Sequence, residues 1–326
     1  MFQIKSLKLI IACGITSYIS FYSQPIIANT LYPSVDTGQP TGSFTLRQGI
    51  SYSNFSWSIS QSSLDNRPLS HLSYEDIEMD TTAVEMNISK LLGFKPSYWD
   101  ISVQMSYGKV QSGTLIDNDY VYSMGEQSLS TQTTASLKGS TNYGLEIGAN
   151  RALNASRTSN LDMLLGFTLV RDIYKQTNGY QTYSQGRAFT TPLEIDGLDS
   201  RYEALWLGPY VGLAQHYNLG QNKFTFSSKL RGHVYSGEGY WNLRKEFAQP
   251  KSFEHSAFGA GIEIKANHIL NLTSSMRIEQ HVGFDHNRTL SGKDTVFYAN
   301  GSSMETNLLP AEKNNFFYNI GFTWLM

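Results

Sequence analysis

The chain has 326 residues and a net charge of −2. Few of its residues are charged (16%), and many are aromatic (13%). The near-neutral charge gives no bias toward nucleic acid, and a single cysteine, Cys13, excludes a disulfide framework. The mean hydropathy of −0.31 resembles that of a soluble protein. A transmembrane β-barrel has the same average, because lipid-facing apolar residues alternate with lumen-facing polar ones.

The N-terminus has the pattern of a secretory signal peptide. Two lysines precede a mostly apolar stretch from Leu9 to about Tyr22, and the small residue Ala28 follows. Cleavage there predicts a signal peptide at 1–28 and a short periplasmic segment at 29–43. A membrane anchor would need about 20 apolar residues. The residues before Cys13 also resemble a lipoprotein cleavage site, but the apolar stretch continues beyond it.

Apolar and polar residues alternate with a period of two along much of the remaining chain, which predicts strands with two different faces. The alternation covers Ile101–Gly108, Tyr143–Asn150 and Met276–Phe284, where the charged residues Arg277 and Glu279 fall on one face. In a membrane barrel one face meets lipid and the other the lumen. A soluble sandwich could alternate in this way, but its strands would be nearer five or six residues than ten.

Ten runs of this kind follow one another, an even number as in bacterial outer-membrane barrels. They lie near 44–60, 71–92, 97–112, 132–151, 160–176, 200–217, 223–240, 252–268, 272–290 and 314–326. The predicted fold is therefore all-β: a ten-stranded antiparallel transmembrane β-barrel over 44–326, in the outer membrane of a Gram-negative bacterium.

The connections between these strands alternate in length. The short ones lie at Phe94–Pro96, Leu153–Asn160, Gly220–Lys223 and His268–Leu272. The long ones lie near 61–70, 113–131, 177–199, 241–251 and 291–313. With a periplasmic N-terminus, the short turns face the periplasm and the long loops face the cell surface.

Several stretches within 45–326 resemble the omptins, a family of ten-stranded outer-membrane endopeptidases with the active site at the extracellular rim. The run Gly113–Tyr120 is similar to the omptin segment that carries an Asp-x-Asp pair. Pro209–Leu213 matches a central strand, and Tyr235–Gly237 matches the strand before the second catalytic loop. The last strand resembles the C-terminal signature of outer-membrane barrels, but it ends in Met326 instead of the usual Phe.

The resemblance implies a peptidase with two Asp residues on one side of a groove, an Asp-x-His pair on the other, and the attacking water between them. Asp117 and Asp119 are the candidate catalytic residues for the first pair. They share a strand face because they are two residues apart. As an alternative, they are turn-forming loop residues around Asn118.

The second catalytic pair is absent. The matching positions read Lys245-Glu246-Phe247, and the stretch 238–250 contains neither Asp nor His. Lys245 is expected to pair with one of the two carboxylates across the rim, which would occupy the place of the water. His255, at the start of the next strand, is the candidate replacement base.

Omptins hold lipopolysaccharide through basic residues on the outer wall, and Gly166–Arg171 is similar to one such strand. The resemblance implies that Arg171 binds a phosphate of lipopolysaccharide at the membrane interface. An ordinary interface arginine is the alternative. The implied partners are outer-membrane lipids, lipopolysaccharide and a host surface protein or peptide. No metal ion, nucleic acid or cofactor other than lipopolysaccharide is expected.

Three functions compete. The favoured one is an omptin-like surface protein, an adhesin or structural component, whose catalysis is impaired by loss of the Asp-x-His pair. The alternative is an active aspartic-type endopeptidase that cleaves peptides at the cell surface. A porin is disfavoured because ten strands enclose little more than their own side chains. Charged residues are also expected to pair and plug the lumen: Lys138, Glu146, Lys229, Arg231, Glu263 and Lys265.

Overall fold

The computed structural model describes residues 42–61, 67–94, 97–123, 126–156 and 158–326; the predicted signal peptide lies outside them. These residues form twelve strands: β1 (Gly42–Ser60), β2 (Ser70–Phe94), β3 (Ser97–Ser123), β4 (Glu126–Ser136), β5 (Thr141–Ala155), β6 (Ser159–Ser184), β7 (Arg187–Leu219), β8 (Asn222–Tyr240), β9 (Phe253–Asn271), β10 (Met276–Thr289), β11 (Gly292–Phe297) and β12 (Ser303–Leu325). No helix among the described residues is long and apolar enough to cross a membrane.

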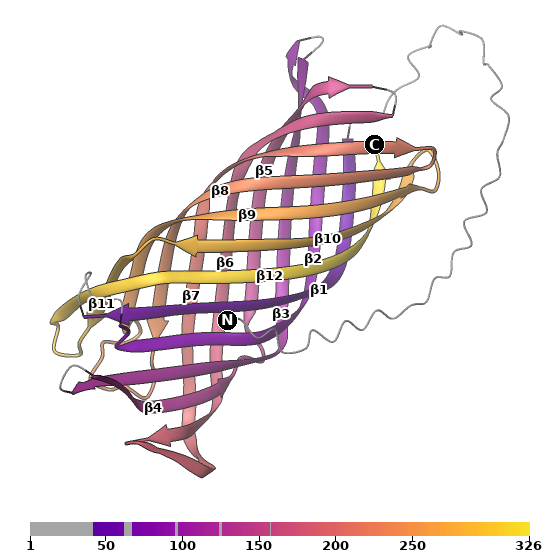
Figure 1. Ribbon diagram of the computed structural model, residues 1–326. Helices are drawn as coiled ribbons and strands as arrows, with labels where there is room; N and C mark the ends of the chain where they lie inside the picture. Colours follow the sequence, from indigo (N-terminus) through magenta and orange to yellow (C-terminus); the bar gives the residue numbers. More distant parts are fainter. Residues whose placement is uncertain (1–41, 62–66, 95–96, 124–125, 157) are drawn as a thin grey trace, which may run out of the picture. The chain divides into compact units, whose positions relative to one another are not determined.

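The strands form one closed antiparallel ring (Figure 1). β1 pairs with β12 from Ser43↔Leu325 to Ser60↔Asn307, which closes the ring. β4 and β5 both pair with β3 and β6, so together they occupy one strand position in the wall of the barrel. β10 and β11 share the position between β9 and β12 in the same way. The twelve described strands therefore occupy ten positions, and the predicted ten-stranded barrel is confirmed.

Large apolar side chains point outward from the wall. On β1 and β12 the exposed residues are Phe44, Leu46, Ile50, Tyr52, Phe316, Tyr318, Ile320, Phe322 and Trp324. Between them on β1, Thr45, Arg47 and Ser51 are buried. A continuous exposed apolar band of this kind suits lipid and not water, which is the arrangement that the alternation in the sequence predicts.

Inward side chains in the middle of the barrel form buried ion pairs. Lys229 Nζ lies 2.7 Å from Glu146 Oε1 and 3.1 Å from Glu263 Oε1, and Arg231 also pairs with Glu263. The lumen contains the expected paired charge at these four residues. The prediction for Lys138 is wrong: it lies exposed in the turn between β4 and β5.

Two predicted loops are paired strands instead. β3 turns into β4 after Ser123, and β6 turns into β7 after Ser184, so the prediction of loops at 113–131 and 177–199 is wrong. These hairpins extend one end of the barrel, here called the rim. Neither face of such an extension meets lipid, so the strands lack the alternation that reveals the membrane part. The bend predicted at His268–Leu272 also lies slightly later, between β9 and β10.

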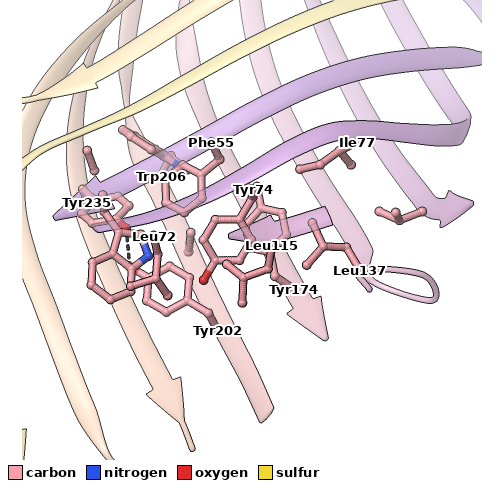
Figure 2. Close-up of a cluster of buried hydrophobic side chains, with 14 of the residues drawn as sticks. Phe55, Leu72, Tyr74, Ile77, Leu115, Leu137, Tyr174, Tyr202, Trp206 and Tyr235 are labelled. Carbon is pink, nitrogen blue, oxygen red and sulfur yellow. Dashed lines mark hydrogen bonds between the residues drawn. The ribbon is translucent and has the colours of Figure 1, made fainter. Parts of the chain in front are cut away.

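An aromatic cluster fills the barrel near the rim (Figure 2). Its central members are Phe55, Tyr74, Tyr174, Tyr202, Trp206 and Tyr235. Phe55 stacks on Tyr174 with ring centroids 5.4 Å apart, and Tyr74 lies 4.6 Å from Tyr174. Along β1, Arg47 of the lumen ion pairs comes first, then Phe55, and then Trp57. The cluster therefore separates the lumen charges from the rim.

The topology can be tested by labelling single cysteines in intact cells, because the chain's only cysteine, Cys13, lies in the predicted signal peptide. We expect a membrane-impermeant maleimide to label Ser123→Cys and Gln185→Cys, at the tips of the rim hairpins. Ser156→Cys, in the opposite turn, should be labelled only after the outer membrane is opened. All three positions are exposed, so the reverse labelling pattern would mean that the barrel is inverted.

Candidate functional site

A cavity of about 220 Å³ lies at the rim, beyond the aromatic cluster. Its walls come from β1, β3, β9, β11, the residues at the start of β2, and the loop between β8 and β9. The polar side chains that line it are Ser70, Asp117, Asp119, Arg244, His255 and Asp294. The three catalytic candidates predicted from the sequence therefore meet at one cavity, which we call the rim cavity.

Asp117 and Asp119 lie on the part of β3 that pairs with β4, so the alternative that they form a turn is wrong. The Ser70 hydroxyl donates a hydrogen bond of 3.4 Å to Asp117 Oδ1. The Thr131 hydroxyl donates one of 3.0 Å to Asp119 Oδ2. Each carboxylate thus has its own hydroxyl partner, and β3 presents both to the same cavity.

Asp117 lies well beyond Tyr107, the last outward ring of the apolar band on β3, and is therefore outside the membrane-spanning part. Burial, followed by the charge of Asp119, raises the pKa of the Asp117 carboxyl to about 8. The Ser70 hydrogen bond and the positive charge of Arg244 act in the opposite direction. Near neutral pH the Asp117 carboxyl therefore favours its protonated form.

The loop between β8 and β9 contributes Arg244 and Phe247 to the cavity, but not Lys245. Lys245 is exposed, so the prediction that it faces Asp117 or Asp119 is wrong. A tight turn explains the difference: Phe247 N–H donates a 3.1 Å hydrogen bond to Arg244 O, which brings residues three apart to the same side. The guanidinium of Arg244 lies 4.7 Å from the centroid of the Phe247 ring.

His255 pairs with Asp294, a residue that the sequence did not single out. The two stand opposite each other on β9 and β11, with Nε2 3.1 Å from Asp294 Oδ1. The Tyr202 hydroxyl lies 2.9 Å from the other ring nitrogen, Nδ1. Asp294 was missed because β11 has only six residues and lies within a predicted loop. Its carboxylate accepts a 2.6 Å hydrogen bond from Thr306, which fixes its position.

The imidazole of His255 is completely enclosed. Its side chain is 0% exposed and that of Asp294 is 1% exposed. Trp57 packs edge-on at 4.5 Å, and Phe253 lies 5.1 Å away. Although Nε2 is close to Asp294, the direction is poor and no hydrogen bond forms. Although His255 borders the cavity, its side chain has no solvent-exposed surface, and Tyr202 and Asp294 flank its two nitrogens, so it is not placed to take a proton from a water there.

Gly237 explains how the Tyr235–Gly237 motif supports this arrangement. A Cβ atom at Gly237 would lie 2.1 Å from Tyr202 Oη and 3.1 Å from His255 Cβ. Only a residue without a side chain lets the Tyr202 hydroxyl reach both His255 and Tyr235, whose hydroxyl lies 2.5 Å from that of Tyr202. The motif that matches the strand before the omptin catalytic loop therefore positions His255 here.

Arg171 lies on the outer wall, away from the rim cavity, and its side chain is about half exposed. Its Nε donates a 3.1 Å hydrogen bond to Glu203 Oε2. Glu203 also pairs with Arg201 at 3.1 Å, and Lys175 is exposed on the same face of β6 as Arg171. Two arginines thus pair with one carboxylate, and a lysine lies on the same outward face. No group of His, Cys, Asp or Glu suited to a metal ion occurs among the described residues.

The model of the family Pom, Protochlamydia outer membrane protein, matches residues 45–318. The chain belongs to this family. It is therefore an outer-membrane β-barrel protein of a Gram-negative bacterium. A search of curated proteins finds no match.

Among solved structures, the Pom barrel is similar to the outer membrane protease OmpT from Escherichia coli, with a TM-score of 0.70 and 15% identity over 90% of this chain and 100% of OmpT. The translocator domain of NalP from Neisseria meningitidis matches at a TM-score of 0.35 and 8% identity, over 90% of each chain. OprG from Pseudomonas aeruginosa matches at 0.35 and 9% identity, over 89% of this chain and 98% of OprG. The likeness to OmpT confirms the omptin-like fold that the sequence predicts.

The buried carboxyl of Asp117 should make stability depend on pH. Because folding raises its pKa from 3.8 to about 8, the folded state binds an extra proton, and the wild type should lose stability as pH rises through this window. Asp117→Asn removes the ionisable group. We expect its unfolding temperature in detergent micelles to fall less than that of the wild type between pH 5 and pH 9. Asp196→Asn, an exposed carboxylate on β7, should behave like the wild type; equal curves for all three proteins would contradict the raised pKa.

Proposed function

We propose that this protein is an omptin-like surface adhesin that holds polypeptide segments at the rim cavity without cleaving them at peptidase rates. One observation carries the proposal: the cavity has carboxylates but no accessible base. Arg244 and Phe247 line the wall where the family resemblance leads to an Asp-x-His pair, and His255 has no exposed surface. General-base catalysis typically contributes about 10²–10⁴-fold to the rate, so its loss leaves a binding site.

An active endopeptidase is the second candidate, and the Asp117–Asp119 pair favours it. Two carboxylates that share one proton are the catalytic unit of aspartic proteases, and the raised pKa of Asp117 near Asp119 fits such a pair. The hydrogen bonds argue against it. Asp117 bonds Ser70 and Asp119 bonds Thr131, and no hydrogen bond joins the two carboxylates themselves. Each carboxylate is therefore held by its own hydroxyl, and the two do not share a proton through a direct hydrogen bond.

A peptidase assay distinguishes the two candidates. We expect the refolded wild type, supplemented with lipopolysaccharide, to bind peptides with paired basic residues and to cleave them only at background rate, with OmpT as the positive control. The double substitution Arg244→Asp and Phe247→His places a carboxylate and an imidazole on the cavity wall. It should raise cleavage measurably above the wild type, and a further Asp119→Ala should abolish the gain.

Fast cleavage by the wild type that is lost in Asp119→Ala would refute the proposal that catalysis is impaired. It would establish the protein as an endopeptidase. Its loss in His255→Ala as well would identify the replacement base. Absence of both binding and cleavage, in protein that still migrates as a folded barrel on unheated gels, would refute the adhesin.

We infer that the outer wall around Arg171 binds lipopolysaccharide. Arg171, Lys175 and Arg201 project from β6 and β7 beside the apolar band, and Glu203 neutralises only part of their charge. Guanidinium groups bind phosphate through paired hydrogen bonds, and the interface is a place where arginine costs little. Glu203 would hold the side chains in position before a phosphate arrives.

Arg171→Ala should weaken lipopolysaccharide binding about fivefold while the fold remains intact, since one basic residue near an anionic membrane surface contributes about 1 kcal/mol. Binding can be measured by titrating the folded protein with fluorescent lipopolysaccharide. Arg187→Ala, an exposed arginine at the tip of the β6–β7 hairpin, is the matched control and should not change the affinity. Equal affinities for both variants would reduce Arg171 to an ordinary interface residue.

A further inference from the structure

A second cavity lies in the middle of the barrel, next to Trp206 of the aromatic cluster. Its volume is about 200 Å³. One water needs only about 10–15 Å³ of such space, so the cavity has room for several waters or for one small solute. Strands β1, β3, β9 and β12 each contribute inward polar side chains to it, and we call it the lumen cavity. Among the described residues, its walls include the cations Arg47, Lys229, Arg231, Lys265 and Lys313.

Four of these cations have a carboxylate partner: Arg47 pairs with Glu85, Lys229 with Glu146, Arg231 with Glu263 and Lys313 with Asp172. Lys265 differs from the expectation that it pairs. It has no ion pair and no side-chain hydrogen bond within the part of the chain that the structure describes. Its strand neighbour Ile264 points outward, so Lys265 points into the lumen. An ammonium group inside the barrel without an anion beside it is unfavourable.

Two amide side chains add hydrogen-bond donors to the same cavity. Gln104 Oε1 accepts a 2.5 Å hydrogen bond from Arg47 Nη2, and Asn319 Oδ1 accepts one of 2.9 Å from the Thr81 hydroxyl. Both amide oxygens are therefore engaged. The amide nitrogens, Gln104 Nε2 and Asn319 Nδ2, have no acceptor among the described residues. Lys265 lies within electrostatic range of Arg47, so its ammonium is near the residue that holds Gln104.

This set of groups favours an oxyanion over a cation. Lys265 repels a cation, and the lining carboxylates are already engaged. Glu146 and Glu263 pair with lysine and arginine, and Asp285 accepts hydrogen bonds from Asn287 and Asn315. A water can satisfy an amide nitrogen, but it cannot neutralise an ammonium group. An oxyanion does both, because it carries charge and several acceptor oxygens.

We propose that the lumen cavity binds one small oxyanion, with a phosphate or carboxylate group held by the ammonium of Lys265 and the amides of Gln104 and Asn319. The site lies on the far side of the aromatic cluster from the rim cavity, and it does not depend on the proposed function. A ligand that binds the folded state alone raises its stability. The anion would therefore supply the missing partner of Lys265 and stabilise the barrel.

The test titrates sodium phosphate, and separately sodium acetate, by calorimetry into the folded protein in detergent and in a buffer free of both anions. Every protein carries Arg171→Ala, so that the outer wall does not contribute. Lys265→Gln should weaken binding at least about tenfold, because hydrogen bonds to charged groups are among the strong ones. Lys265→Arg keeps the charge and should retain binding. Lys109→Gln, which removes an exposed lysine from the outward face of β3, is the matched control and should not change the affinity.

Asn319→Asp gives a second test that does not require the loss of Lys265. It replaces an amide with a carboxylate of the same shape, which supplies the partner that Lys265 lacks. Its unfolding temperature should not rise when the anion is added, whereas that of the parent protein should rise.

Binding of phosphate alone, of acetate alone or of both supports the inference and identifies the group that the site takes. The inference is overturned if neither anion binds the folded parent protein, if Lys265→Gln binds as tightly as Lys109→Gln, or if Asn319→Asp responds to the anion as the parent does. Should Lys265→Gln not fold, the comparison of Asn319→Asp with the parent decides the question.

Discussion

The need to pair every backbone amide governs this structure. In lipid, an unpaired N–H or C=O costs several kcal/mol, so a chain that crosses as strands must close its sheet completely. The β1–β12 ladder provides that closure over almost the whole length of β1. Where the wall is interrupted, between β4 and β5 and between β10 and β11, both halves keep the same two neighbours. The ring therefore remains closed although the chain makes a turn within the wall at each of these two positions.

Closure also determines what each level of the barrel can contain. In the membrane part the inward charges are largely buried, and Lys229, Glu146 and Glu263 pair with one another. Nearer the rim the same inward positions hold rings, from Phe55 to Trp206. Beyond the rings the strands continue as hairpins, and there the carboxylates of Asp117 and Asp119 face the rim cavity.

The aromatic cluster explains why the chemistry at the rim differs from that of a peptidase. His255 and Asp294 have the residue types of a catalytic pair, but the packing of Trp57 and Tyr202 encloses them. Such a buried pair contributes to structure, since Tyr202 holds His255 and Thr306 holds Asp294 in place through hydrogen bonds. The exposed wall that faces Asp117 is left to Arg244 and Phe247, which can bind but cannot exchange a proton near neutral pH.

The sequence by itself determined the all-β class, the ten wall positions and the inward or outward side of most membrane-part residues, because lipid on one side and a packed lumen on the other impose a period of two. It also placed Asp117 and Asp119 on one face. Only the tertiary structure decided that Asp294 meets His255, that Arg244 and not Lys245 enters the cavity, and that Lys138 turns out of the lumen. These outcomes depend on a tight turn, a short strand and a break in the wall. Where neither face of the chain meets lipid, alternation disappears, and contacts between distant strands decide the positions of the side chains.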